Sequence, residues 1–170
     1  GEVVEVGASV TAVAVGDRVL VDPAIRCGEC DECRRGDDPL CLATLVVGGN
    51  HPGGFAEKVA VPAAFVHPIP DSVDFVEAAT IPTAYSTAWK AIVSAARPRV
   101  GEWMMIHAAA SGVSTAAIQI AKRAGCNVLA TAGSDAKLEV AKRLGADVVV
   151  NNRTDDFVEA AKRATGGRGV

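Results

Sequence analysis

Residues 27–41 read Cys27-Gly-Glu-Cys30-Asp-Glu-Cys33-Arg-Arg-Gly-Asp-Asp-Pro-Leu-Cys41, and they contain four of the chain's five cysteines. Thiolates this close in sequence can reach one tetrahedral centre, and zinc takes four such sulfur ligands in closed structural sites. Because a site with four protein ligands has no open position for a substrate, the metal would fasten the loop and do no chemistry. The stretch therefore predicts a structural zinc site, with nearby Arg26, Arg34 and Arg35 able to offset its negative charge.

Two other uses of clustered cysteines remain open. Disulfides suit a secreted protein, but the fifth cysteine, Cys126, makes the number odd, and no signal peptide is visible. An iron–sulfur cluster also takes closely spaced cysteines, although the bacterial ferredoxin pattern has a closer fourth cysteine followed by proline. Here Pro39 precedes Cys41. We interpret Cys126 as a small buried hydrophobic residue at the start of a strand.

The composition allows one sizeable core or two small ones. The chain has 170 residues, 49% of them hydrophobic, and no apolar run approaches the length of a membrane span. A net charge of −3 without a basic tract argues against nucleic acid as a main partner. Because the chain begins inside an apolar strand pattern and stops just after a glycine-rich turn, we expect a piece of a longer protein.

The hydrophobic pattern changes near residue 72. Before it, short β-branched runs bounded by Gly, Asp and Pro predict strands at 3–6, 19–21, 45–47 and 59–61. After it, helical patterns at 75–79 and 84–95 lead into a strand–helix alternation. Strands are predicted at 103–107, 128–131 and 148–150, and helices at 113–124, 134–144 and 157–164. Three βα units in sequence predict an α/β fold in which a parallel sheet forms half of a doubly wound domain.

The first strand-to-helix junction of this second part is rich in small residues. It reads Ile106-His107-Ala108-Ala109-Ala110-Ser111-Gly112-Val113-Ser114. Small residues let the backbone approach a pyrophosphate, and a helix N-terminus offers free N–H groups and a positive dipole end. The dinucleotide fingerprint is incomplete, since Ala109, Ser111 and Ser114 occupy its three glycine positions. The junction therefore predicts a pyrophosphate site, with the Ser111 and Ser114 hydroxyls as further donors. A tight turn in an ordinary α/β domain remains the alternative.

The end of the second predicted strand bears on the choice of cofactor. An NAD site would place Asp or Glu there for the ribose 2′-hydroxyl. The chain reads Thr131-Ala132-Gly133-Ser134-Asp135-Ala136-Lys137, with no acid at the strand end. Ser134 and Lys137, close to a helix N-terminus, could hold a 2′-phosphate, which favours NADP(H) over NAD(H). The alternative is that Ser134 only caps the helix and Lys137 is a solvated charge.

In this order, the pieces resemble the medium-chain dehydrogenase/reductase superfamily of zinc-dependent alcohol dehydrogenases and quinone oxidoreductases. The resemblance covers essentially the whole chain and rests on the four-cysteine stretch together with Val15-Gly16-Asp17-Arg18-Val19, Gly53-Gly54-Phe55-Ala56-Glu57 and Ala110-Ser111-Gly112-Val113. It implies a partial GroES-like catalytic domain at 1–71 and a partial Rossmann NAD(P)-binding domain at 72–170, with the active site between them. It also implies that Cys27, Cys30, Cys33 and Cys41 are structural zinc ligands, that Ala109 to Ser114 hold the pyrophosphate, and that Thr87 packs near the nicotinamide.

One departure from the family pattern concerns the catalytic zinc. Two of its usual ligands, a Cys and a Gly-His-Glu motif, are absent from this chain, and the position of the third is Thr83. Threonine is a poor zinc ligand beside thiolate or imidazole. Quinone-oxidoreductase-like members work without this metal, so the resemblance is mixed and the catalytic residues stay unknown. We expect His107 to be packed or hydrogen-bonded at the end of its strand.

Together these features predict a fragment of an NADP(H)-dependent oxidoreductase that transfers hydride between nicotinamide and an alcohol or carbonyl, an enone or a quinone. The fragment alone is expected to be inactive. Two alternatives are a non-enzymatic, metal-stapled nucleotide-binding module and, less favoured, an iron–sulfur protein. We expect a small-molecule substrate, a homo-oligomer, no nucleic-acid or membrane partner, and a cytoplasmic location, because an all-thiolate metal site survives best in a reducing compartment.

Overall fold

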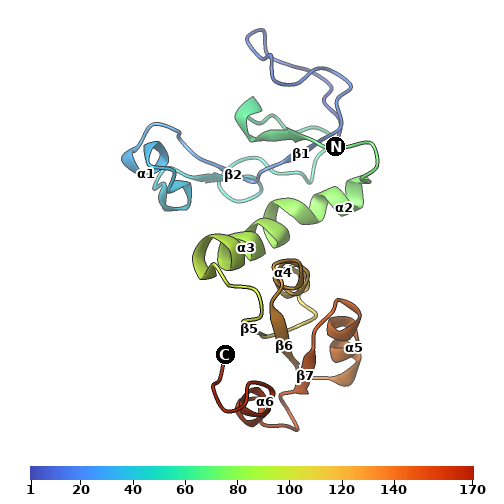
Figure 1. Cartoon of the computed structure of the whole chain (residues 1–170). Coiled ribbons are helices and arrows are strands. Elements are labelled where there is room, and N and C mark those ends of the chain that lie inside the picture. Colours follow the sequence, from blue (N-terminus) through green and yellow to red (C-terminus); the bar gives the residue numbers. More distant parts are fainter. The chain divides into compact units, whose positions relative to one another are not determined.

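The computed structural model describes all residues from Gly1 to Val170 and has the predicted α/β architecture (Figure 1). The chain forms two compact units, Gly1–Pro82 and Thr83–Val170, which we call unit 1 and unit 2. The boundary that we expect after residue 71 separates a GroES-like domain from a Rossmann domain. It is a different division from that into compact units, and it stays a prediction.

Unit 1 contains two short antiparallel strand pairs. Strand β1 (Val19–Val21) pairs with β4 (Val66–Pro68), and β2 (Ala24–Ile25) pairs with β3 (Leu45–Val46). The cysteine loop runs between β2 and β3 and contains the short helix α1 (Asp31–Arg34) and the 3-10 turn η1 (Asp38–Leu40). A second 3-10 turn, η2 (Ala63–Phe65), leads into β4. The strand pair β2–β3 therefore closes the base of the cysteine loop.

Two of the strands predicted for unit 1 are wrong. Residues 3–6 form no ladder: Glu2 makes one isolated bridge to Arg18, and Val3 exchanges hydrogen bonds only with Asp17 and Gly16. Residues 59–61 pair with no strand of the chain. β-branched residues favour extended backbone, but a strand also needs a neighbour for its N–H and C=O groups.

The entry to helix α2 (Phe75–Thr80) is fixed by polar contacts. Asp74 and Glu77 form a reciprocal capping box at its start. Arg18 donates hydrogen bonds to the carbonyls of Pro70 (3.1 Å) and Val73 (2.8 Å), and its guanidinium lies 4.7 Å from the centre of the Phe75 ring. These contacts attach the beginning of α2 to the beginning of β1.

The segment predicted as one α-helix at 84–95 is helical but not uniformly α. The α-helical turn α3 (Ser86–Trp89) lies between two π-helical segments, η3 (Ile81–Tyr85) and η4 (Lys90–Ala96). The helix ends at Arg97, whose φ of 48° is left-handed and whose N–H bonds back to the carbonyl of Ile92. The hydrophobic spacing cannot distinguish the two helix types over so few turns.

Unit 2 is built on the predicted parallel sheet. Its strands β5 (Trp103–Ile106), β6 (Asn127–Ala132) and β7 (Val148–Asn151) pair in that order. They alternate with helices α4 (Gly112–Arg123), α5 (Asp135–Arg143) and α6 (Phe157–Ala164). Each helix begins shortly after the preceding strand ends, so all three helix N-termini lie at the carboxyl edge of the sheet, where α/β folds bind ligands.

Helices cover both faces of this sheet (Figure 1). Val128 and Ala130 of β6 pack into one core cluster with α4 and α5, whereas Leu129 packs into the other with α6. Helices α4 and α5 therefore lie on one face and α6 on the other. Cys126, 1% exposed and directly before β6, is the buried residue that its position predicts.

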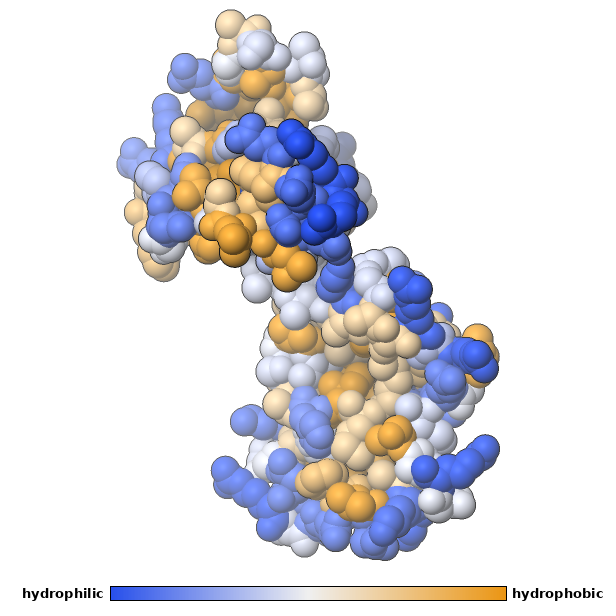
Figure 2. All heavy atoms as spheres, turned by 90° about the vertical axis from the view of Figure 1, so that its left-hand side faces the viewer, coloured by the Kyte–Doolittle hydropathy of each residue, from blue (hydrophilic) through white to orange (hydrophobic).

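Neither unit contains a helix long and apolar enough to cross a lipid bilayer. Figure 2 shows apolar surface mixed with hydrophilic surface on the face that it displays. Large hydrophobic side chains exposed near the cysteine loop are Leu40, Leu42, Leu45 and Val46.

Candidate functional site

The four clustered cysteines converge on one point of unit 1. Their sulfur atoms all lie within 4.8 Å of one another, and the Cys27 sulfur is 3.9 Å from that of Cys33 and 3.6 Å from that of Cys41. Four sulfurs at about 2.3 Å from a tetrahedral zinc would be about 3.8 Å apart. The arrangement therefore fits a zinc tetrathiolate, and it is the only cluster of three or more Cys, His, Asp and Glu residues in the structure that could hold a metal.

The environment of these thiols differs from one to the next. A hydrogen bond from the Cys27 backbone lowers the pKa of Cys41 to about 6, whereas desolvation raises the pKa of Cys33 to about 12. Hydrogen bonds from the backbone and the side chain of Cys33 lower the pKa of Cys30, but desolvation and the Cys27 and Cys41 thiols together outweigh them, and the net pKa is raised. Four thiolates this close repel one another, so a divalent cation is needed to keep all of them ionised.

Two of the three arginines predicted to offset this charge already have partners. Arg26 forms an ion pair with Asp22 at 2.8 Å, and Arg35 forms one with Glu32 at 3.1 Å. Their positive charge is therefore shared with carboxylates beside the cysteine loop. The local secondary structure positions three of the four sulfur atoms. Cys30 is the N-cap of α1, Cys33 lies within α1, and Cys41 is the C-cap of η1.

In unit 2, the predicted pyrophosphate turn lies between β5 and α4. Ser111 is the N-cap of α4 and accepts a hydrogen bond from the Ser114 N–H. The Ser111 hydroxyl donates to the Ser114 hydroxyl (2.9 Å), which donates to the carbonyl of His107 (2.7 Å). Both hydroxyl protons are thus used inside the turn. Gly112 and Val113 are exposed in the first turn of α4, where N–H groups lack intrahelical acceptors and are the donors available to an anion.

The loop after β6 is the predicted ribose-recognition segment. Ser134 is the N-cap of α5 without a capping hydrogen bond from its side chain, and Lys137 is exposed in the first turn of that helix. The carboxylate of Asp135 accepts a hydrogen bond from the Asn151 side chain at 3.0 Å. This contact holds the one acidic residue of the loop against the end of β7.

Sequence reasoning missed Arg153, two residues beyond β7. A Cβ atom on Gly133 would lie only 3.1 Å from Nε of Arg153, so the guanidinium group is beside the loop that carries Ser134. The available signal was a cation just after the third strand. Interpreting it requires knowing that β7 is the neighbour of β6, so that their carboxyl ends meet.

The two threonines named by the family resemblance lie on one helix in unit 2. Thr83 is in η3 and Thr87 is in α3, and both are exposed. A spacing of four residues places them on the same side of a helix. The one Cys, His, Asp or Glu cluster that could hold a metal is the four-cysteine cluster of unit 1, and Thr83 is not part of it.

The three histidines have different surroundings. His51 pairs through Nδ1 with the Pro52 carbonyl (3.1 Å), and His67 is exposed on β4. His107 forms a hydrogen bond through Nδ1 with the Thr131 hydroxyl at 2.8 Å, which confirms the prediction that it is hydrogen-bonded at the strand end.

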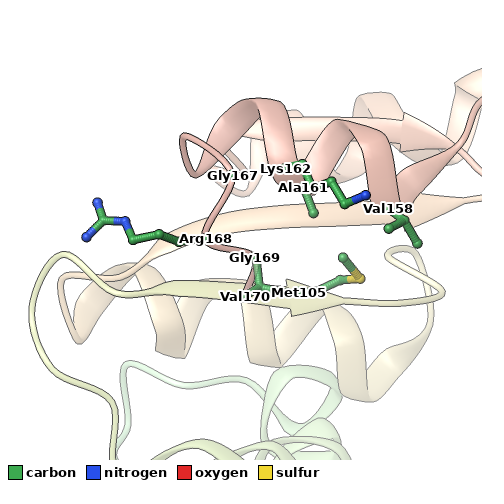
Figure 3. A pocket seen from close by; sticks show the side chains of 8 residues that line it. All are labelled: Met105, Val158, Ala161, Lys162, Gly167, Arg168, Gly169 and Val170. Carbon is green, nitrogen blue, oxygen red and sulfur yellow. The ribbon is translucent and has the colours of Figure 1, made fainter.

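A separate cavity of about 290 Å³ lies between α6 and the last residues of the chain. Met105, Val158 and Ala161 form its apolar lining, and Arg168 points away from them (Figure 3). None of the residues predicted to bind the cofactor or the metal lines this cavity.

The cysteine cluster that fits structural zinc lies in one of two parts of the chain that match known protein families, and helix α4 with strands β6 and β7 of the parallel sheet lies in the other. Residues 1–71 match the alcohol dehydrogenase GroES-like domain, and residues 112–170 match the zinc-binding dehydrogenase family. Together these matches cover more than half of the chain, which belongs to the medium-chain dehydrogenase/reductase superfamily, as its motifs predict.

Individual relatives agree with this assignment. The chain is 44% identical over 132 residues to an alcohol dehydrogenase of Geobacillus stearothermophilus, a match that covers 76% of this chain and 38% of that protein. The solved structure of an NAD-dependent alcohol dehydrogenase matches with 44% identity and a TM-score of 0.95, over 100% of this chain and 50% of the other. A cobalt- and zinc-bound thermostable alcohol dehydrogenase of Pyrobaculum aerophilum matches with 36% identity and a TM-score of 0.80, covering 88% and 45% respectively.

The chain thus spans half or less of the length of these relatives. It shares this superfamily with alcohol dehydrogenases, and its four-cysteine cluster is suited to zinc.

Proposed function

We propose that the protein carrying this chain is an NADP(H)-dependent oxidoreductase that exchanges a hydride between nicotinamide and an alcohol or carbonyl, an enone or a quinone. The observation that carries the proposal is the convergence of three features at the carboxyl edge of one parallel sheet. They are the small-residue turn before α4, the loop from Gly133 to Lys137, and Arg153 beside that loop.

The pyrophosphate would bind at the first turn of α4. The N–H groups of Gly112 and Val113 and the positive end of the helix dipole suit an anion there. Ala109 is fully buried beneath the turn, and its N–H donates to the Thr131 carbonyl at 2.9 Å. Ser111 and Ser114 would then act mainly by holding the turn, because their hydroxyl protons are already donated within it.

The preference for NADP(H) rests on charge around Gly133. Two cations, Lys137 and Arg153, are near this loop, and the carboxylate of the loop itself, Asp135, accepts a hydrogen bond from Asn151. A 2′-phosphate would be stabilised by both cations, whereas a 2′-hydroxyl would lack the acidic acceptor typical of NAD sites. Because one similar solved structure is that of an NAD-dependent alcohol dehydrogenase, the preference for NADP(H) has to be tested against NAD(H).

The bound nicotinamide supplies the hydride chemistry. This chain's own residues would bind and orient the cofactor, with Thr87 against the nicotinamide. The cysteine cluster would only stabilise its loop, since four protein ligands leave no open position on a zinc ion. Thr83 offers a hydroxyl where a thiolate would be expected, so we favour enones and quinones as substrates over zinc-activated alcohols.

We also propose that the enzyme is a cytoplasmic homo-oligomer acting on a small molecule, with no nucleic-acid or membrane partner. The all-thiolate cluster and the net charge of −3 support the location and the lack of a nucleic-acid partner. The homo-oligomer rests on the family resemblance alone.

Steady-state oxidation of NADPH and NADH by the intact protein, with a panel of aldehydes, enones and quinones, tests the proposal. Turnover that is faster with NADPH at limiting cofactor supports it. Tight binding of either nucleotide without turnover on any substrate would instead support the rival function, a non-enzymatic nucleotide-binding module. That module is compatible with the incomplete glycine pattern.

A further inference from the structure

His107 lies at the carboxyl end of β5, directly before the turn that leads to α4. Its Nδ1 forms a 2.8 Å hydrogen bond with the hydroxyl of Thr131, a residue of β6 that is fully buried. The ring also meets Phe157 of α6 edge to face, with centroids 5.4 Å apart and an interplanar angle of 83°. Contacts from two neighbouring elements thus fix the orientation of a side chain at the rim of the sheet.

The same two residues, His107 and Thr131, also hold the backbone of the turn. The His107 carbonyl accepts the Ser114 hydroxyl at 2.7 Å, and the Thr131 carbonyl accepts the Ala109 N–H at 2.9 Å. Ala108, between these anchor points, has a φ of 52°. A left-handed conformation is unfavourable for alanine, so the turn keeps it only because its surroundings impose it.

We propose that His107 is a positioning residue for the cofactor: its hydrogen bond to Thr131 locks β5 to β6 at the point where the turn must present the N–H groups of Gly112 and Val113. The inference rests on the proposed cofactor site. His107 acts through the turn and does not touch the reacting atoms.

The contacts explain why an imidazole suits this position. It combines a polar atom in reach of a buried hydroxyl with a flat ring that packs on Phe157. Phenylalanine would keep the ring and lose the hydrogen bond, leaving the Thr131 hydroxyl buried without a partner. Asparagine would keep a polar group near the position of Nδ1 and lose the ring.

The test measures NADPH dissociation constants and steady-state kinetics of the intact protein with His107→Phe, His107→Asn, Thr131→Val and the double variant His107→Phe/Thr131→Val. We expect His107→Phe and Thr131→Val each to weaken NADPH binding roughly fivefold to tenfold and to raise KM for the cofactor. kcat should change by less than about twofold. His107→Asn should bind NADPH almost as tightly as the wild type. The double variant should bind NADPH no more weakly than whichever single variant binds it less tightly.

Unchanged NADPH affinity in both single variants, or losses that simply add in the double variant, would overturn the inference. So would a lower melting temperature without a change in affinity, since that is the signature of a purely structural role. Thr131→Val removes the same hydrogen bond by deleting the hydroxyl group. The inference can therefore still be tested if His107→Phe does not fold. His67→Phe, on exposed β4 in unit 1, is the matched control. If the wild-type protein binds no nicotinamide nucleotide, the proposed function fails instead.

Discussion

Lys137 and Arg153 are the side chains on which the choice of cofactor depends most directly. Replacing either with alanine should weaken NADPH binding by roughly tenfold and leave NADH binding unchanged, because each removes a screened, exposed cation from a 2′-phosphate site. Fluorescence titration with both nucleotides measures this.

Lys142→Ala is the matched control for these two variants. Lys142 lies at the other end of α5, paired with Glu139 at 2.7 Å, and its loss should affect neither nucleotide. Equal losses for NADPH and NADH, or no loss at all, would argue that Lys137 and Arg153 are ordinary surface charges.

Asp147 has a structural role at the opposite edge of the sheet. Although burial raises its pKa, hydrogen bonds from Lys122 (2.7 Å) and from the Val128 N–H (2.7 Å) outweigh that effect, and the net pKa is lowered. Asp147→Asn should lower stability by about 1 kcal/mol at neutral pH, after allowance for solvent screening. Denaturant unfolding of both proteins measures the difference.

The pH dependence of this difference follows from the sign of the shift. A carboxyl whose pKa is lower in the folded state stabilises the protein above its unfolded pKa, about 3.9, and stops doing so as pH falls through the folded value. The difference in unfolding free energy between the wild type and Asp147→Asn should therefore become smaller below about pH 4. If this difference in unfolding free energy stays constant from neutral to acidic pH, ionisation of Asp147 does not contribute to stability.

At the scale of elements, the cysteine loop depends on its metal more than on its secondary structure. Helix α1 has four residues and contains no buried residue, and the strands beside the loop have two residues each. Removing zinc with a chelator should unfold this loop, and bound zinc should be lost on acidification because thiolates must be deprotonated to bind it.

Cys33→Ser should lower the zinc content by one ion per subunit, as measured by elemental analysis. Cys126→Ala, which changes a buried cysteine of unit 2 outside the cluster, should retain the metal. Zinc lost equally from both variants would show that general destabilisation, not loss of a ligand, releases the ion. A brown protein containing iron would contradict the zinc assignment itself.

The elements that could be predicted from the sequence are those whose pattern is local. The three strands of unit 2 and helices α4, α5 and α6 follow from hydrophobic spacing and from Gly125 and Gly145, which have φ of 80° and 102° directly after the C-cap residues of α4 and α5. The cysteine spacing likewise predicts the metal cluster. The pairing of β2 with β3 could not be predicted, because residues 24 and 25 are too few for a periodic signal.

Whole-molecule features needed long-range information. The place of Arg153 beside Gly133 depends on β7 lying next to β6, and the hydrogen bond between Asn151 and Asp135 depends on the same neighbourhood. Neither is visible in local spacing. Residues 59–61 show the converse: a run rich in β-branched residues forms no strand when no other segment of the chain pairs with it.

The fold and the family matches place the chain in the superfamily of the alcohol dehydrogenases, and our proposals depend on the claim that it binds NADP(H). Calorimetric titration of the intact protein with NADPH and with NADH, at one ionic strength, tests that claim most directly. We predict binding of one equivalent of NADPH per subunit, with a dissociation constant roughly tenfold lower than that for NADH. Tighter binding of NADH, or binding of neither nucleotide, would contradict the account.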